Sequence, residues 1–207
     1  IAGNVSGIDE ALTRTEKTIK FNGNAKLQTT NKKFGTASAN LDGINSYLSV
    51  GANDEFGFGT DDFTIEAWIR PSGNTTLQTL FDFRRLSAAQ GLRIVQDSQA
   101  INVYNGTTQS ITSGNVVTTT GTWMHIAVSR KDNVTQLYVN GAQVGTNYVD
   151  NNDYLYAALY VGQDFNGSTH WTGHMDNVVV KKGVGDYTTG FQAPSQVDYN
   201  QSNIVFG

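Results

Sequence analysis

The chain has 207 residues, of which only 15% are charged, and its net charge of −4 excludes the basic surface that nucleic-acid binding needs. The absence of cysteine excludes disulfides and thiolate metal sites, and no apolar run is long enough for membrane insertion. Asn, Gln, Ser and Thr supply 69 residues but Glu only 4, which disfavours long exposed helices and predicts an all-β protein with many turns.

The first 20 residues read as an extension ahead of the domain. A helix is expected only over residues 8–18, where Asp9 and Glu10 precede Ala11 and Leu12, and even there the apolar stripe is thin. We therefore expect an N-terminal arm over residues 1–20 and one β-sandwich domain over residues 21–207. Because the chain starts at Ile rather than Met, we expect it to be processed or to be part of a longer polypeptide.

Segments with a two-residue alternation of apolar and polar side chains then follow at intervals of roughly ten residues, which is typical of an antiparallel β-sandwich. In residues 63–70 the odd positions are apolar, whereas the even positions include Glu66, Trp68 and Arg70. The first strand is expected from residues 18–21 or from residues 204–206, or is absent. The predicted strands cover residues 47–50, 63–70, 79–84, 92–96, 100–104, 124–130, 134–139, 159–161 and 175–180.

The strongest local signal is the dipeptide Asn140-Gly141 between two apolar runs. Asn-Gly supplies the two positive φ angles of a type I′ turn, so a two-residue hairpin is expected. This hairpin pairs Val139 with Ala142 and places their side chains on one face of the sheet.

Several short motifs occur in a recognisable order along the chain. They are Lys33-Phe34-Gly35, Leu41-Asp42-Gly43, Gly121-Thr122-Trp123-Met124-His125, Leu137-Tyr138-Val139-Asn140-Gly141 and Gly173-His174-Met175-Asp176-Asn177. Together they resemble the laminin G-like, concanavalin A-like family over about residues 33–195. The resemblance implies an all-β antiparallel β-sandwich with a jelly-roll topology. The ending over residues 183–194 is similar to versions of this family found in bacteriophage structural proteins.

Two loops carry the residue types that bind sugars. Aromatic rings stack on sugar rings, and planar amides and carboxylates bind sugar hydroxyls. Residues 147–156 interleave Tyr with Asp and Asn, and residues 162–171 add Phe, Trp, Asp and His. The alternative is that Asn and Asp form turns and the rings pack at the sheet margin. The candidate glycan-binding residues are Tyr148, Asp150, Asn152, Asp153, Tyr154, Tyr156, Asp164, Asn166, His170 and Trp171.

The resemblance also implies a structural Ca²⁺, because the family often holds one with an aspartate of the Asp-Gly motif and one from the last strand. These positions map to Asp42 and Asp176. An acid among the apolar neighbours of Asp176 needs a cation, an arginine or a backbone partner. Hydrogen bonding to turn amides without a metal is the alternative. His170 and His174 lie about 13 Å apart on an extended segment, so they are not expected to share a zinc ion.

Catalysis is not expected. Glycosidases need two carboxyls roughly 5–9 Å apart, and on a strand this means acids at positions i and i+2. Glu66 stands alone on its strand, so a glycoside hydrolase is a remote alternative.

These observations predict a non-enzymatic glycan-binding or adhesion module of a virion, such as a phage fibre or decoration, or of a bacterial-surface protein. The alternative is a purely structural virion protein that stabilises an assembly through its N-terminal arm. The expected partners are a surface glycan or a neighbouring virion or structural protein, and a homo-oligomer is left open. The expected location is an extracellular surface or a virion.

Overall fold

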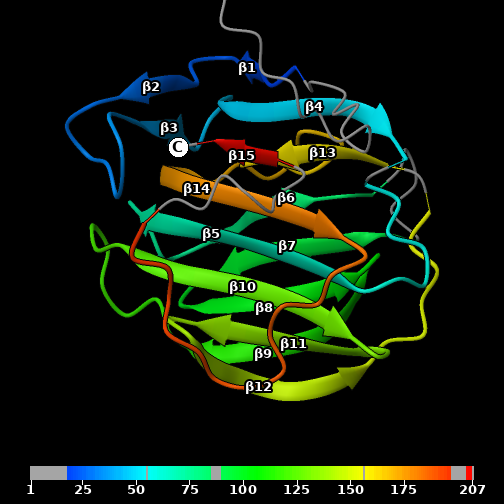
Figure 1. The fold of residues 1–207 in the computed structure, drawn as a ribbon. Coiled ribbons are helices and arrows are strands. Elements are labelled where there is room, and N and C mark those ends of the chain that lie inside the picture. The colour runs from blue at the N-terminus through cyan, green and yellow to red at the C-terminus, as the bar shows by residue number, and fades with distance from the viewer. Residues whose placement is uncertain (1–17, 55, 85–89, 156, 197–203, 207) are drawn as a thin grey trace, which may run out of the picture.

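The computed structural model describes residues 18–54, 56–84, 90–155, 157–196 and 204–206. These residues form two antiparallel β-sheets stacked as a sandwich (Figure 1). No helix in these ranges is long and apolar enough to cross a membrane. The helix predicted over residues 8–18 and the arm predicted over residues 1–20 lie almost entirely outside the described residues.

The two sheets contain seven and eight strands. The seven-stranded sheet runs in the order β1 (Lys20–Asn22), β4 (Tyr47–Asn53), β13 (Ala157–Val161), β6 (Leu77–Asp82), β7 (Leu92–Asp97), β8 (Ala100–Asn105) and β9 (Thr108–Asn115). The eight-stranded sheet runs in the order β12 (Ala142–Val149), β11 (Val134–Val139), β10 (Met124–Lys131), β5 (Phe63–Pro71), β14 (Thr172–Lys182), β3 (Ser38–Asp42) and β2 (Lys26–Gln28), and β15 (Ile204–Phe206) also pairs with β14.

The all-β antiparallel sandwich is confirmed, and each strand predicted from the sequence overlaps an observed one. Both candidates for the first strand are strands, because β1 pairs with β4 and β15 pairs with β14. The predicted hairpin is also confirmed: Val139 pairs with Ala142, and Asn140 and Gly141 both have positive φ. The polar edge strand β9 was not predicted, and β12 was predicted only at its start, as the second arm of the hairpin, because most of the side chains of both strands face solvent and show little alternation.

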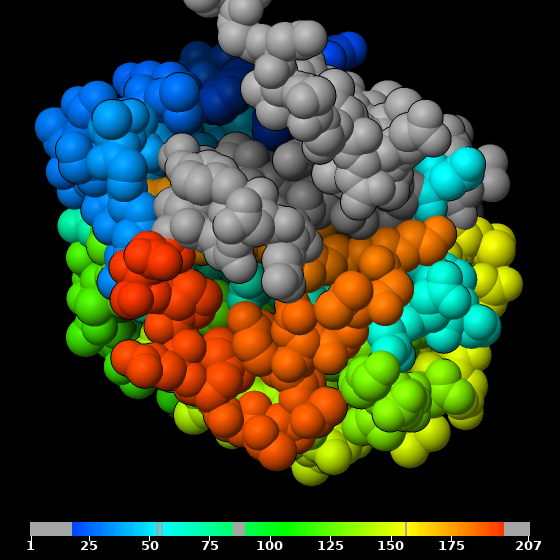
Figure 2. Space-filling model, viewed as in Figure 1, coloured from blue at the N-terminus to red at the C-terminus, as the bar shows by residue number. Residues whose placement is uncertain are grey.

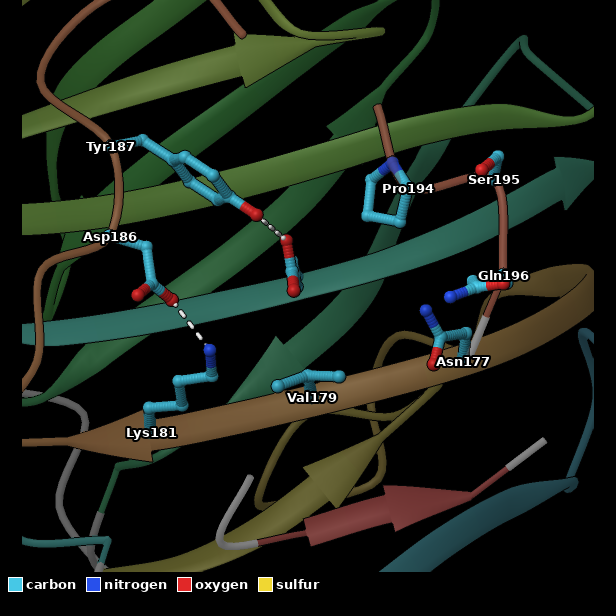
Figure 3. A pocket seen from close by; sticks show the side chains of 9 residues that line it. Asn177, Val179, Lys181, Asp186, Tyr187, Pro194, Ser195 and Gln196 are labelled. Carbon is cyan, nitrogen blue, oxygen red and sulfur yellow. Dashed lines mark hydrogen bonds and ion pairs between the residues drawn. The ribbon is translucent and has the colours of Figure 1, made fainter. Parts of the chain in front are cut away.

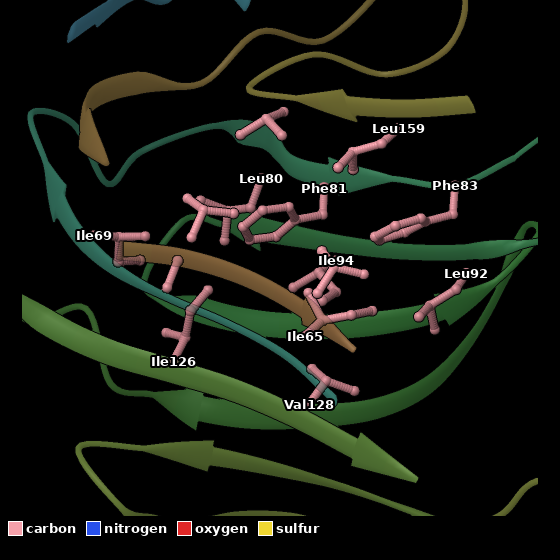
Figure 4. Packing of buried hydrophobic residues seen from close by; sticks show 14 of the residues in the cluster. Ile65, Ile69, Leu80, Phe81, Phe83, Leu92, Ile94, Ile126, Val128 and Leu159 are labelled. Atoms are coloured by element: carbon pink, nitrogen blue, oxygen red, sulfur yellow. The ribbon is translucent and has the colours of Figure 1, made fainter. Parts of the chain in front are cut away.

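The inner faces of the two sheets enclose one hydrophobic core (Figure 4). One sheet supplies Ile65, Ile69, Ile126 and Val128, and the other supplies Leu80, Phe81, Ile94 and Leu159, among others. Each such side chain stabilises the fold by about 1.5–3 kcal/mol when it is fully buried. The alternation predicted for residues 63–70 is therefore the alternation of a strand that faces this core.

The outer face of β5 is also buried, which the alternation did not indicate. Residues 183–196, here called the C-terminal strap, run back across the outer face of the eight-stranded sheet and appear orange to red in Figure 2. The strap is tied to the sheet at several points. Thr64 Oγ1 donates to the carbonyl of Val184 at 2.9 Å, and Tyr187 Oη donates to Glu66 Oε2 at 2.7 Å. Glu66 is consequently only 5% exposed.

The hairpin turn and the strap fit closely against each other. The amide of Phe191 donates to the carbonyl of Gly141 at 2.9 Å, and a Cβ at position 141 would overlap the carbonyl oxygen of Phe191. Gly183 has the same φ of +80°, but a Cβ there would have no neighbour within 4 Å. A comparison of alanine substitutions at these two glycines therefore separates the cost of backbone strain from the cost of steric overlap.

We expect Gly183→Ala to lower the free energy of unfolding by about 1 kcal/mol, the cost of a side chain at positive φ. Gly141→Ala should cost about 2 kcal/mol more, because the strap must also move away from the new methyl group. Urea unfolding of both variants measures the difference. Equal losses would show that the strap is not held against this turn.

Candidate functional site

The first predicted loop closes on a buried carboxylate. Asp150 is 1% exposed and accepts hydrogen bonds from Thr135 Oγ1 at 2.7 Å and from Tyr154 Oη at 3.0 Å. Asn152 Nδ2 donates to Asp150 Oδ1 at 2.6 Å and to Tyr148 Oη at 3.1 Å. Burial raises the pKa of Tyr154, and the Asp150 charge adds to this effect. The loop side chains therefore satisfy one another.

The second predicted loop is organised in the same way. Asp164 is 2% exposed and accepts from the backbone amides of Ser168 and Thr169 at 2.7 and 3.0 Å. Trp171 is fully buried, and its Nε1 donates to Gln96 Oε1 at 2.9 Å. These groups hold the loop in shape, and of its larger rings Trp171 lies in the core whereas Phe165 is half-buried beside Arg84.

The prediction that aromatic residues of these loops stack on a sugar is thus wrong for those that are buried. Tyr154 is 4% and Trp171 0% exposed, because both rings fill the core. His170 is half-buried and hydrogen-bonded to Gln163 at 2.8 Å. Asp153 and Asn166 do face solvent. Tyr156 lies outside the described residues.

The two aspartates predicted to hold Ca²⁺ are not brought together. The β3–β14 register pairs Asp42 with Thr172, so Asp176 lies four residues further along β14, about 13 Å away. Asp176 Oδ2 accepts from the amides of Lys33 and Phe34 at 2.7 and 3.0 Å. Among the described residues there is no group of three or more His, Cys, Asp or Glu that could hold a metal. The residues therefore do not fit a calcium ion shared by these two carboxylates.

Asp42 instead holds a turn. Its Oδ1 accepts from the amides of Ile44, Asn45 and Ser46 at 2.9, 3.1 and 3.0 Å, and its Oδ2 accepts from Asn24 Nδ2 at 3.0 Å. Burial acts to raise the pKa of Asp42, but these hydrogen bonds outweigh it and hold the pKa well below its usual range. This is the turn-amide alternative considered from the sequence.

A groove of about 520 Å³ lies on the outer face of the seven-stranded sheet. It is built on β1, β4 and β13, which lie side by side in Figure 1. Its lining residues are Lys20, Asn22, Tyr47, Ser49, Val50, Gly51, Ala52, Arg84, Ala157, Ala158, Tyr160 and Phe165.

Two tyrosines from neighbouring strands form the aromatic part of the groove. Tyr160 of β13 pairs with Ser49 of β4, which places Tyr47 diagonally across from it. The ring centroids are 6.3 Å apart and the ring planes are tilted by 44°. Both tyrosines are half-buried, so part of each ring faces the groove.

An ion pair between Arg84 and Asp82 forms another wall of the groove. Arg84 Nε donates to both carboxylate oxygens of Asp82 at 3.0 Å, and Arg84 Nη2 donates to Oδ2 at 2.6 Å. Asp82 is fully buried, and the ring of Phe165 lies 4.6 Å from Arg84 Cζ. Lys20 is exposed at the β1 side. The wall is therefore rigid and its charge is largely compensated.

Sequence reasoning missed this groove although it predicted the strands that build it. Tyr47 and Ser49 alternate with the buried Leu48 and Val50, and Tyr160 stands between the buried Leu159 and Val161. Outward-facing tyrosines on predicted strands were the available signal. Local alternation did not indicate that these two strands are neighbours in the sheet.

The chain matches the family model of the concanavalin A-like lectin/glucanases superfamily over residues 42–184. No curated protein matches the sequence. Among solved structures, domain 4 of AbnA, an extracellular GH43 arabinanase from Geobacillus stearothermophilus in complex with arabinotriose, is similar with a TM-score of 0.60. The identity is 20%, and the match covers 87% of this chain and 85% of that one.

The binding domains of botulinum neurotoxins are similar as well. The serotype D domain has a TM-score of 0.62 at 14% identity, and the match covers 82% of this chain but 44% of that one. The binding domain of botulinum neurotoxin DC in complex with SialylT has a TM-score of 0.59 at 14% identity, with the same coverage. The chain thus spans less than half of these toxin domains. These likenesses show the fold.

We expect Asp42→Ala to lower the free energy of unfolding by about 1–2 kcal/mol at pH 7, because three turn amides lose a charged acceptor. A carboxyl whose pKa is lowered by folding stabilises the protein above its unfolded pKa, and this contribution is lost as the pH falls through the folded pKa. The gap between wild type and variant should therefore narrow as the pH falls below about 4. Urea unfolding at pH 7 and pH 3 measures it, with Asp153→Ala as a matched control at an exposed aspartate. A gap of constant size would contradict the assigned role.

Proposed function

Because the chain belongs to the concanavalin A-like lectin/glucanases superfamily, we propose that it is a carbohydrate-binding module and that the groove on its seven-stranded sheet takes an extended glycan chain. The observation that carries this proposal is the pair of half-buried tyrosines, Tyr47 and Tyr160, side by side in that groove. Aromatic rings with polar groups around them are the surface that sugar rings and hydroxyls require.

The geometry of the tyrosine pair favours a twisted chain over a flat one. The centroid separation of 6.3 Å is close to the length of one sugar unit, so each ring can meet a successive unit. Because the ring planes differ by 44°, a bound chain must turn between those units. Arabinotriose, found in the similar arabinanase domain, supports a short oligosaccharide as the kind of ligand to test first.

The charge of the groove supports a neutral or weakly acidic glycan. Arg84 is compensated by Asp82, and Lys20 is the remaining cation among the groove's charged lining residues. Asp82 is fully buried in its ion pair, which supports a binding role rather than acid–base catalysis. Non-enzymatic binding is therefore part of this proposal.

We place the module at an extracellular or virion surface, where it recognises glycans for adhesion. The purely structural role in a virion, with an N-terminal arm on a neighbour, is the competing proposal. It requires contacts made by residues 1–20, so a variant without residues 1–17 separates the two. If the adhesion proposal is right, the truncated chain still binds the glycan. If the structural proposal is right, the truncated chain no longer joins the assembly.

The groove is tested by removing its rings. Tyr160→Ala and Tyr47→Ala should each weaken binding to a responsive polysaccharide about 5- to 30-fold, because a stacked ring contributes on the order of 1–2 kcal/mol. A glycan array finds the ligand, with arabinan, xylan and sialylated glycans included, and calorimetry then measures the affinity.

Tyr104→Ala is the matched control, since Tyr104 lies on β8 of the same sheet but does not line the groove. It should bind as the wild type does. The proposed function is refuted if the protein binds no glycan on the array above background. If both groove variants bind with unchanged affinity, the glycan site lies elsewhere on the molecule.

A further inference from the structure

A second cavity lies on the opposite sheet. It has a volume of about 400 Å³ and lies between the C-terminal strap and the outer face of β5 and β14 (Figure 3). Its floor is Val179, and Tyr187, Pro194 and Ser195 from the strap form walls. This volume lies at the lower end of the range for small-molecule sites.

A β-bulge aims a polar side chain into this cavity. The register between β14 and β5 shifts between Asp176 and Val179, and Asn177 has a positive φ of 48°. Met175 and Val178 both face the core, so two consecutive residues, Asp176 and Asn177, lie between them. Bulges of this kind redirect side chains and are common beside binding sites. Figure 3 shows Asn177 on the same side of the strand as Val179.

Among the residues that the structure describes, none makes a hydrogen bond to the amide oxygen of Asn177, although Asn177 is only 2% exposed. A buried acceptor without a partner costs about as much as a lost hydrogen bond, so it calls for a donor from beyond the described residues. Because Asn177 lines the cavity, a molecule in the cavity can supply that donor.

The charges around the cavity disfavour an anion. Glu66 accepts from Tyr187, and Lys181 Nζ is paired with Asp186 Oδ2 at 2.9 Å, which leaves one net negative charge on the lining. Burial acts to raise the pKa of Glu66, but the imidazole of His125, 3.3 Å away, with smaller contributions from Tyr187 and Lys181, outweighs this effect and lowers the pKa. Glu66 is therefore an ionised acceptor at neutral pH.

We infer that this cavity binds a single neutral sugar unit. Hydroxyl groups donate to Asn177 Oδ1 and to the carboxylate of Glu66, and the apolar face of the sugar ring lies against Val179 and Pro194. The planar amide, the carboxylate and the apolar floor of the cavity are then all used. The site lies on the opposite sheet from the groove and does not rest on the groove binding a glycan.

The test is an NMR titration of the full chain with L-arabinose, D-galactose, D-glucose and D-mannose, with glucuronate as the anionic comparison. At least one neutral sugar should shift signals of residues around the cavity with a dissociation constant on the order of 1 mM, as its size allows. Titration with a tetrasaccharide of the same sugar distinguishes a free sugar from the end unit of a chain, which binds more tightly in the second case.

Two variants keep the inference falsifiable. Asn177→Gly removes the amide at a position where glycine accepts the positive φ, and it should weaken binding about tenfold. Asn133→Gly is its matched control, an exposed asparagine at φ 61°, and should bind normally. Ser195→Trp places a bulky ring at the exposed rim and should abolish binding. The inference is overturned if no neutral sugar binds, if glucuronate binds as well as the neutral sugars, or if Asn177→Gly and Ser195→Trp both bind normally.

Discussion

The double burial of β5 is the constraint on which the rest of this structure depends. Its inner face lies in the core, and its outer face is covered by the C-terminal strap, so the polar outer side chains need partners inside the protein. Glu66 meets this need with His125 on β10 and Tyr187 on the strap. Tyr187 then stacks on Phe191 with centroids 3.6 Å apart. One buried carboxylate thus fixes where the strap crosses the sheet.

A second buried charge organises one end of the sandwich. Arg130 is fully buried and donates to the carbonyls of Gly59, Asp61 and Asn152. Its guanidinium also lies against the ring of Tyr154, 5.0 Å from its centroid. A buried arginine must have its donors satisfied, so the surrounding loops are held by their backbones. This is why a loop rich in Tyr, Asn and Asp became part of the scaffold.

The two sheets therefore differ in what they offer to a ligand. The strap covers part of the eight-stranded sheet and leaves a cavity of about 400 Å³ beside Asn177, whereas the seven-stranded sheet carries a groove of about 520 Å³ with tyrosines on adjacent strands. Both surfaces are built on outward-facing strand positions, to which the groove adds Phe165 from the second predicted loop and the cavity adds residues of the strap.

The sequence by itself determined the class of fold, most of the strands and the hairpin at Asn140-Gly141, because alternation and turn chemistry are local properties. It also indicated that Glu66 stands without a second acid on its strand. Only the tertiary structure decided that Trp171 and Tyr154 are buried, that Asp42 and Asp176 lie apart, and that Tyr47 and Tyr160 are neighbours. Alternation states which side chains share a face of a strand. Which faces are then covered depends on strand order and on the path of the strap, and both are set by contacts between residues far apart in the chain.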